Sequence, residues 1–105
     1  MARQTNYARG YKVELKIVKE LEAEGFIAIR TAGSHSPWDV IGIKGDEVRL
    51  VQGKRCKEPG DTAAIIKKAV SELEKIETAI CVFQELWIWV DSIGFTKRAV
   101  PWRGQ

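Results

Sequence analysis

Four polar residues stand where the sequence pattern predicts apolar side chains: Glu14, Asp39, Gln52 and Lys54. Charged groups are costly to remove from water unless they are paired or bind a metal, so their convergence indicates a site. A hard cation such as Mg²⁺ takes oxygen ligands, which Asp39, Gln52 and a backbone carbonyl near Gly53 could supply, with Glu14 as a further ligand. Lys54 is placed to orient or deprotonate a water, or to stabilise charge on a phosphate. Together these groups describe phosphodiester hydrolysis assisted by a metal ion.

Two strands are predicted to carry three of these residues, over residues 38–43 and 47–55. Gly45 fits the first central position of a two-residue type II′ turn, although a three-residue loop would change the register. The side chains alternate between faces, so Asp39 is expected on the face of Ile41 and Ile43, and this apolar face is expected to lie at the core. Counting from the turn predicts these pairs across the hairpin: Ile43 with Val48, Ile41 with Leu50, and Asp39 with Gln52.

A helix is predicted over residues 8–24, with Gly25 placed to end it in the left-handed conformation. At about 100° per residue, Glu14 falls inside the apolar stripe of this helix. Glu14 is therefore expected to point toward the body of the protein. The stripe consists of Tyr11, Leu15, Ile17, Val18 and Leu21.

The remaining elements complete the order α-β-β-β-α-β-β around a mixed sheet. Residues 26–30 read as the first strand, followed by a loop over residues 31–37. A second helix is expected from a cap at Asp61 or Thr62 to about Ala79, with Ile80 closing its apolar stripe. Residues 79–83 fit either a helix end or a short strand. The last strands are expected at 86–91 and 95–102, and Trp87 and Trp89 favour core or dimer packing over base stacking.

Size and composition are typical of one domain covering residues 1–105, in which 45% of the residues are hydrophobic. There is no apolar run of the roughly 20 residues that a membrane helix needs, and no apolar stretch of a signal peptide at the N-terminus. We therefore expect a soluble, cytoplasmic protein. Cys56 and Cys81 lack the spacing of a zinc site or a disulfide scaffold.

The net charge of +3 is mild, but the basic residues are clustered along the chain. A polyanionic partner is plausible, although such runs are more often solvated faces. The clusters are Arg3, Arg9, Lys12, Lys16 and Lys19, then Lys54, Arg55 and Lys57, then Lys97, Arg98 and Arg103.

Three segments resemble the PD-(D/E)xK nuclease superfamily, and within it the archaeal-type Holliday junction resolvases and related phage or viral enzymes. They are RGYKVE (Arg9 to Glu14), FIAIRTAGSHSPWDVIGI (Phe26 to Ile43) and RLVQGKRCK (Arg49 to Lys57). The resemblance implies an α/β restriction-endonuclease-like fold, with a central mixed β-sheet flanked by helices. It also implies a homodimer that cuts branched double-stranded DNA, using Mg²⁺ or Mn²⁺, in DNA recombination and repair.

Residue by residue, the resemblance implies that Glu14 and Asp39 are acids associated with the metal and that Lys54 is the catalytic lysine. Ser36 or Ser34 corresponds to the loop serine near the scissile phosphate. Contacts to the DNA backbone are expected from basic residues, and a phosphate contact or a simple loop position from His35. The basic candidates are Arg9, Lys12, Arg30, Arg55 and Lys57.

Two residues depart from the family pattern. Gln52 stands where the family usually has Glu or Asp, which removes one negative charge and should weaken divalent-ion binding. Trp38 separates Pro37 from Asp39, so the adjacent Pro-Asp pair is absent.

Structural interpretations compete with each of these assignments. Glu14 could form a bridge with Lys54, Asp39 could cap the 31–37 loop, and Gln52 could be a satisfied amide in the sheet. At the level of function, the alternatives are a non-catalytic DNA-binding module on the same fold and a repair or restriction-type nuclease acting on linear DNA.

Overall fold

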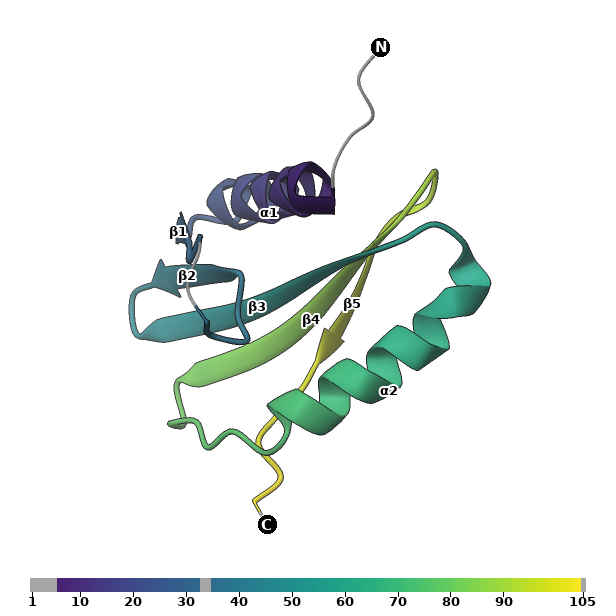
Figure 1. Cartoon of the computed structure of the whole chain (residues 1–105). Helices are drawn as coiled ribbons and strands as arrows, with labels where there is room; N and C mark the ends of the chain where they lie inside the picture. The colour runs from purple at the N-terminus through teal and green to yellow at the C-terminus, as the bar shows by residue number, and fades with distance from the viewer. Residues whose placement is uncertain (1–5, 33–34, 105) are drawn as a thin grey trace.

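The structure, a computed structural model, describes residues 6–32 and 35–104, without the side chains of residues 6–9. A mixed sheet of five strands in the order β1-β2-β3-β4-β5 forms its centre. Only β3 and β4 are parallel among the neighbouring pairs, since α2 connects them as a crossover. Figure 1 shows α1 and α2 on opposite sides of the sheet. The helices are α1 (Asn6–Ala23), η1 (Pro59–Asp61) and α2 (Thr62–Leu73). The strands are β1 (Ile27–Arg30), β2 (Val40–Lys44), β3 (Glu47–Cys56), β4 (Val82–Val90) and β5 (Gly94–Ala99). The predicted fold class and element order are confirmed.

Helix α1 ends through Gly25, as predicted. Gly25 has φ +94°, and the N–H groups of Gly25 and Phe26 donate to the carbonyls of Glu22 and Leu21, each at 3.0 Å. This pair of bonds is the Schellman arrangement, which satisfies carbonyls at the helix end. It also turns the chain directly into β1.

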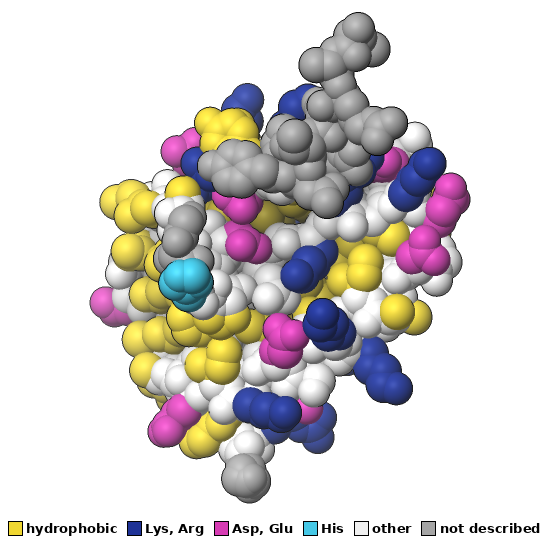
Figure 2. Space-filling view, viewed as in Figure 1, with side chains coloured by type: hydrophobic (Ala, Val, Ile, Leu, Met, Phe, Trp, Pro, Cys, Tyr) yellow, Lys and Arg dark blue, Asp and Glu magenta, His cyan; other side chains and the backbone are white. Residues whose placement is uncertain are grey.

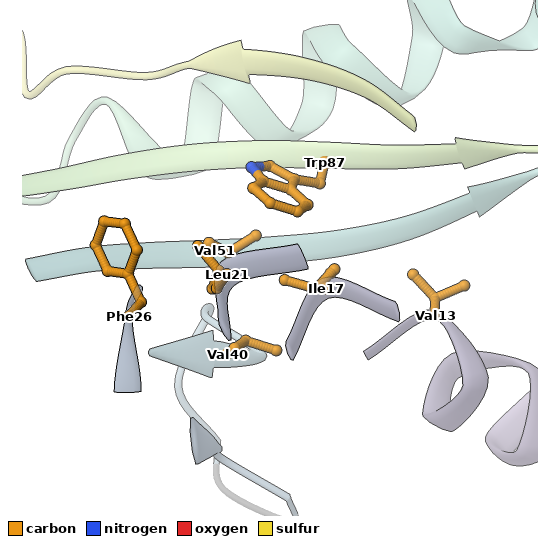
Figure 3. Packing of buried hydrophobic residues seen from close by; sticks show 7 residues of the cluster. All are labelled: Val13, Ile17, Leu21, Phe26, Val40, Val51 and Trp87. Carbon is orange, nitrogen blue, oxygen red and sulfur yellow. The ribbon is translucent and has the colours of Figure 1, made fainter. Parts of the chain in front are cut away.

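Two of the three predicted pairs of the hairpin of β2 and β3 are confirmed, Ile43 opposite Val48 and Ile41 opposite Leu50. The third pair, Asp39 with Gln52, is wrong, because the ladder ends at Val40 opposite Val51 and the N–H of Asp39 donates to the carbonyl of Val51. Gly45 has φ +58°, as the first central position of a type II′ turn requires. The first core cluster lies between α1 and this part of the sheet, and Figure 3 shows its side chains. They are Val13, Ile17, Leu21, Phe26, Val40, Val51 and Trp87.

The prediction that the face of Ile41 and Ile43 lies at the core is wrong. On β2 the buried residues are Val40 and Gly42, which face α1, whereas Ile43 is exposed. Alternation along a strand says which residues share a face, but not which face a helix covers. Here α1 covers the face of Val40, and the face of Ile41 stays open.

Helix α2 ends at Leu73 rather than near Ala79. The chain turns there, with the N–H of Ile76 donating to the carbonyl of Leu73 at 3.0 Å, and distant segments also bond to this end. The amide of Gln84 donates to the carbonyl of Leu73 at 2.9 Å, and the N–H of Arg103 donates to the carbonyl of Glu74 at 3.0 Å. Ile80, predicted in the apolar stripe, is therefore outside the helix and 97% exposed. The ambiguous tract over residues 79–83 leads into β4, which begins at Val82.

A second core cluster fills the space between α2 and the sheet. It contains Cys56, Ala69, Leu73, Leu86, Ile88, Val90 and Val100. Trp87 lies in the first cluster, which confirms core packing for that residue. Within the described residues, no helix is long and apolar enough to cross a membrane.

Candidate active site

A cleft of about 420 Å³ lies between the N-terminal half of α1 and the ends of β2 and β3. Its walls bring together Glu14, Asp39 and Lys54, which the sequence places far apart. The other lining residues are Gly10, Val13, Gly53 and Arg55. Two acids and a lysine therefore meet in one cleft, as the sequence predicts.

Asp39 reaches this cleft because the hairpin ladder is irregular at its end. The N–H of Asp39 donates to the carbonyl of Val51 at 2.8 Å, and Val51 is also the partner of Val40. Two residues thus oppose one, which is the arrangement of a β-bulge, and a bulge re-aims a side chain. The Asp39 side chain turns to the α1 side of the sheet, away from the predicted face of Ile41. Its Oδ2 accepts a bond from the N–H of Gly53 at 2.8 Å, so the loop cap considered from the sequence is not its role.

The pKa of Asp39 is raised above its ordinary value of 3.8, mainly because burial removes water from the carboxylate. The bond from Gly53 and the charge of Lys54 act in the opposite direction, whereas the negative charge of Glu14 raises the pKa further. A carboxylate in this position is stabilised by a nearby cation. The direction of the shift therefore favours a positively charged occupant of the cleft.

Glu14 is held by Arg30 of β1. The Nε of Arg30 lies 2.9 Å from Oε1 of Glu14, and the Arg30 guanidinium carbon lies 4.2 Å from the centroid of the Tyr11 ring. The alternative that Glu14 forms a bridge with Lys54 is wrong, because Arg30 is its partner. Arg30 is thus paired with the helix acid, and its expected contact to DNA stays a prediction.

Gly53 lets α1 approach β3 closely. A Cβ at this position would lie 2.7 Å from Cδ1 of Ile17 and 3.8 Å from Oδ2 of Asp39. Real carbon atoms do not come this close, so any larger residue would push the helix or the Ile17 side chain away. Gly53 also lines the cleft, beside Asp39.

Lys54 lies on the part of β3 that extends past β2. The ladder with β2 ends at Val51, whereas β3 continues to Cys56. The exposed Lys54 side chain consequently lines the cleft of Glu14 and Asp39 on one side and, on the other, a cleft of about 240 Å³ against α2.

Gln52 is placed differently from the other three. It is 5% exposed and lines the cleft on the α2 side, not the cleft of Glu14 and Asp39. Its Nε2 donates to the carbonyl of Pro37 at 3.0 Å, whereas its Oε1 is buried with no hydrogen-bond partner in the described part of the chain. Gln52 is thus a half-satisfied amide behind the cleft. The unpaired oxygen is notable because buried polar atoms are nearly always bonded.

The loop before Asp39 is anchored by a contact that the sequence did not reveal. The indole N–H of Trp38 donates to Oε1 of Gln84 at 3.0 Å, and the Ser36 hydroxyl donates to the carbonyl of Trp38 at 2.9 Å. Gln84 is the third residue of β4 and is 2% exposed. A polar residue within a mostly apolar strand was the only feature of the sequence that could have indicated its role. His35 is exposed in this loop, and Ser34 lies outside the described residues.

Two basic side chains, Lys54 and Arg55, line the cleft. Lys and Arg side chains lie across the middle and right-hand side of the face shown in Figure 2. Arg55 lines the cleft and is paired with Asp91 at 2.6 Å, and Lys12 and Lys57 are exposed. The side chain of Arg9 lies outside the described residues.

The residues of the cleft fit a divalent cation of the Mg²⁺ type. Glu14 and Asp39 bring two carboxylates with a combined negative charge, and Gly53 lines the cleft beside them. In the part of the chain that the structure describes, no three or more His, Cys, Asp or Glu side chains lie together in a group that could hold a metal ion. The donor set is therefore two carboxylates with oxygen ligands of lower charge, weaker than a set of three acids.

A family model described as archaeal Holliday junction resolvase (Hjc) matches residues 5–82, which include all the residues of the cleft. The chain belongs to this family. Among solved structures, the resolvase Hjc from the archaeal hyperthermophile Archaeoglobus fulgidus shares the fold, with a TM-score of 0.60 and 19% sequence identity. The match covers 88% of this chain and 73% of that chain. No curated protein sequence matches the chain.

Membership of the Holliday junction resolvase family confirms the resemblance seen in the three sequence segments. It supports a nuclease that acts on Holliday junctions as the general function. In this chain the family match ends at Val82, so most of β4 and all of β5 lie beyond it.

Proposed function

We propose that this chain is a divalent-metal-dependent, structure-specific endodeoxyribonuclease that resolves four-way DNA junctions as a homodimer. The observation that carries the proposal is the cleft in which Glu14, Asp39 and Lys54 meet beside exposed basic side chains. Two acids next to a lysine are what metal-assisted phosphodiester hydrolysis requires, and the family makes a nuclease the expected chemistry.

Each side chain has a distinct role in this proposal. Asp39 and Glu14 hold the cation, with the carbonyl of Gly53 as a further ligand and the unpaired Oε1 of Gln52 behind them. When bound, the cation neutralises phosphate charge and lowers the pKa of a water. Lys54 orients or deprotonates the attacking water and stabilises charge that develops on the phosphate.

The surrounding residues position the DNA. Lys12, Arg55 and Lys57 are expected to contact the phosphate backbone, which fixes the duplex without reading its sequence. Ser36 and His35, in the loop that precedes Asp39, are candidates for contacts near the scissile phosphate. Specificity would then come from the shape of the junction.

An open apolar face of the sheet supports the homodimer. On the side of Ile41, two neighbouring rows of side chains cross four strands without a charge among them. Ile27 and Ile29 are 67% and 53% exposed in this face. Hydrophobic side chains gather over this end of the molecule in Figure 2. The first row is Ile27, Ile43, Val48 and Val82. The second row is Ile29, Ile41 and Leu50, and it ends at the buried Gln84, where the open face stops.

A second copy of the chain is the occupant that suits this face, because an uncharged patch is complementary to itself under a two-fold axis. A two-fold dimer also places two equivalent sites over two equivalent strands of a junction. We expect Ile29→Lys to convert the dimer into a monomer in sedimentation velocity, whereas the matched control Ile80→Lys leaves it unchanged. A wild-type monomer at micromolar concentration would contradict the dimer.

The substrate is tested by comparing cleavage of labelled four-way, flap and linear duplex DNA at the same Mg²⁺ concentration. The proposal expects paired cuts near the branch of the four-way junction and little cutting of linear DNA. Equal cutting of linear duplex would instead favour the repair or restriction-type nuclease.

One observation favours a second candidate, a DNA-binding module without catalysis. Gln52 stands in place of an acid, so the cleft holds two carboxylates where a stronger metal site has three. Calorimetry with Mn²⁺, beside the cleavage assay, separates the candidates: junction binding without metal binding or cutting supports the module.

A further inference from the structure

A second cleft lies beside the candidate active site. It has a volume of about 410 Å³ and shares Val13 and Arg55 with the first cleft. The two clefts therefore adjoin along α1, one toward β2 and the other toward the turn between β4 and β5. The volume of the second is within the range of small-ligand sites.

The second cleft combines an aromatic wall with positive charge. Trp89 is half-buried, and the Phe95 ring supports it edge-on, with centroids 5.1 Å apart and an angle of 78°. The Nζ of Lys16 lies 4.5 Å from the centroid of the Trp89 ring, so a cation already covers this ring. Lys12 lines the same cleft and is exposed.

An aromatic face beside lysines is the combination that binds an unstacked nucleotide. Bases stack on aromatic rings regardless of sequence, and lysines neutralise the flanking phosphates. The ring of Trp89 packs against the Phe95 ring, whereas Lys16 has a flexible side chain that can move from the Trp89 ring to a phosphate. Arg55 is oriented by Asp91 at 2.6 Å and lies between the two clefts.

We infer that this second cleft binds a single unpaired nucleotide of the DNA strand, with its base stacked on Trp89 and its phosphate between Lys12 and Lys16. The inference rests on the proposed function for its context, because a strand in the first cleft would continue into the second. It gives Trp89 a role in stacking, which the sequence pattern had made the less favoured interpretation. The ligand class is single-stranded DNA, of any sequence.

The test measures binding of fluorescein-labelled (dT)6 to the full chain by anisotropy, in EDTA so that no cleavage occurs. Trp89→Leu is expected to weaken binding at least about fivefold, the loss that corresponds to the lower end of base stacking. Trp89→Phe keeps an aromatic face and should retain most of the affinity. Trp102→Leu is the matched control, because Trp102 is also partly exposed but lies outside this cleft, and it should bind as the wild type does.

A second measurement covers the case in which Trp89→Leu does not fold. In the wild type, (dT)6 that carries one 2-aminopurine should lose fluorescence on binding, and Lys16→Gln should weaken binding while leaving that quenching intact. Unquenched 2-aminopurine, or full affinity in a folded Trp89→Leu variant, would overturn the inference. The cleft would then bind only the phosphates of the strand, through its lysines. Neither readout depends on cleavage, so an inactive nuclease would not affect the result.

Discussion

Arg30 of β1 holds Glu14 of α1, with 2.9 Å between Nε and Oε1. Arg30 is the last residue of β1, the edge strand of the sheet, and Glu14 lies in α1. The ion pair therefore joins the helix to the edge of the sheet. Both side chains are largely shielded from solvent, and the Tyr11 ring lies against the guanidinium. Arg30 is thus a positioning residue for one acid of the cleft.

Replacing Arg30 should affect cleavage more than DNA binding. We expect Arg30→Gln to lower the cleavage rate about 10- to 100-fold, the usual loss when a residue that orients a metal ligand is removed. The Mg²⁺ concentration for half-maximal rate should rise, because Glu14 is no longer held in place. Single-turnover cleavage across a Mg²⁺ titration measures both, and Arg98→Gln on β5 controls for the lost charge. If junction binding falls as steeply as cleavage, Arg30 is a phosphate contact instead.

Gln52→Glu should make stability depend on metal. The Glu side chain cannot donate to the carbonyl of Pro37, so we expect the free energy of unfolding in EDTA to fall by about 1–3 kcal/mol. The added negative charge should keep or raise activity at low Mg²⁺. Urea unfolding with and without Mn²⁺, beside cleavage at limiting Mg²⁺, measures these effects, and Gln52→Met shows what loss of the amide alone does. Complete loss of activity in a folded Gln52→Glu variant would mean that the glutamine has another role.

Gly53 and Ile17 should be energetically coupled. Gly53→Ala introduces a Cβ 2.7 Å from Cδ1 of Ile17, and overpacking of this kind costs about 1–3 kcal/mol. Ile17→Val removes that methyl group and alone should cost about 0.5–1.5 kcal/mol. In a double-mutant cycle measured by urea unfolding, the pair should cost less than the sum of the two single variants. Gly60→Ala, where no atom lies within 4 Å of the added carbon, is the control. Additive costs would show that the helix does not press on Gly53.

Asp39→Asn should stabilise the metal-free protein at neutral pH. Because the pKa of Asp39 is raised by burial, the folded state binds its proton more tightly than the unfolded state does. The stability of the wild type therefore falls as the pH rises from the ordinary value of 3.8 through the raised value, and the cost remains above it. Asn carries no charge and its Oδ1 still accepts from Gly53, so its advantage at pH 7 should vanish below about pH 3.8.

Thermal unfolding in EDTA from pH 3 to pH 8 measures the effect of Asp39→Asn. Mn²⁺ should raise the unfolding temperature of the wild type and not that of the variant. A variant less stable than the wild type at pH 7 in EDTA would contradict the proposed environment of Asp39.

Local sequence patterns correctly predicted the element boundaries that are set by nearby residues. Gly25 ends α1 by its own backbone conformation, and Gly45 sets the register of the hairpin through the turn that it forms. Glu14 could be placed toward the cleft because helical periodicity is regular over the whole of α1. These features depend on residues close to one another in the chain.

The features that the sequence did not predict depend on distant contacts. The side chain of Gln84 donates to the carbonyl of Leu73 at the end of α2, and no pattern within the helix predicts that contact. Simple alternation put Asp39 on the wrong face, since the bulge opposite Val51 re-aims its side chain. Gln52 and Lys54 both line the cleft on the α2 side, but only the exposed Lys54 also lines the cleft of Glu14 and Asp39, which strand alternation alone does not predict.

The most direct test of the central claim is single-turnover cleavage of a labelled four-way junction by the wild type, Asp39→Ala and Lys54→Ala, with binding measured in parallel in Ca²⁺ or EDTA. We expect the wild type to cut in Mg²⁺, and both variants to lose cleavage while they retain most of their junction affinity. Cleavage by either variant at the wild-type rate would contradict the assignment of the cleft of Glu14, Asp39 and Lys54 as the active site.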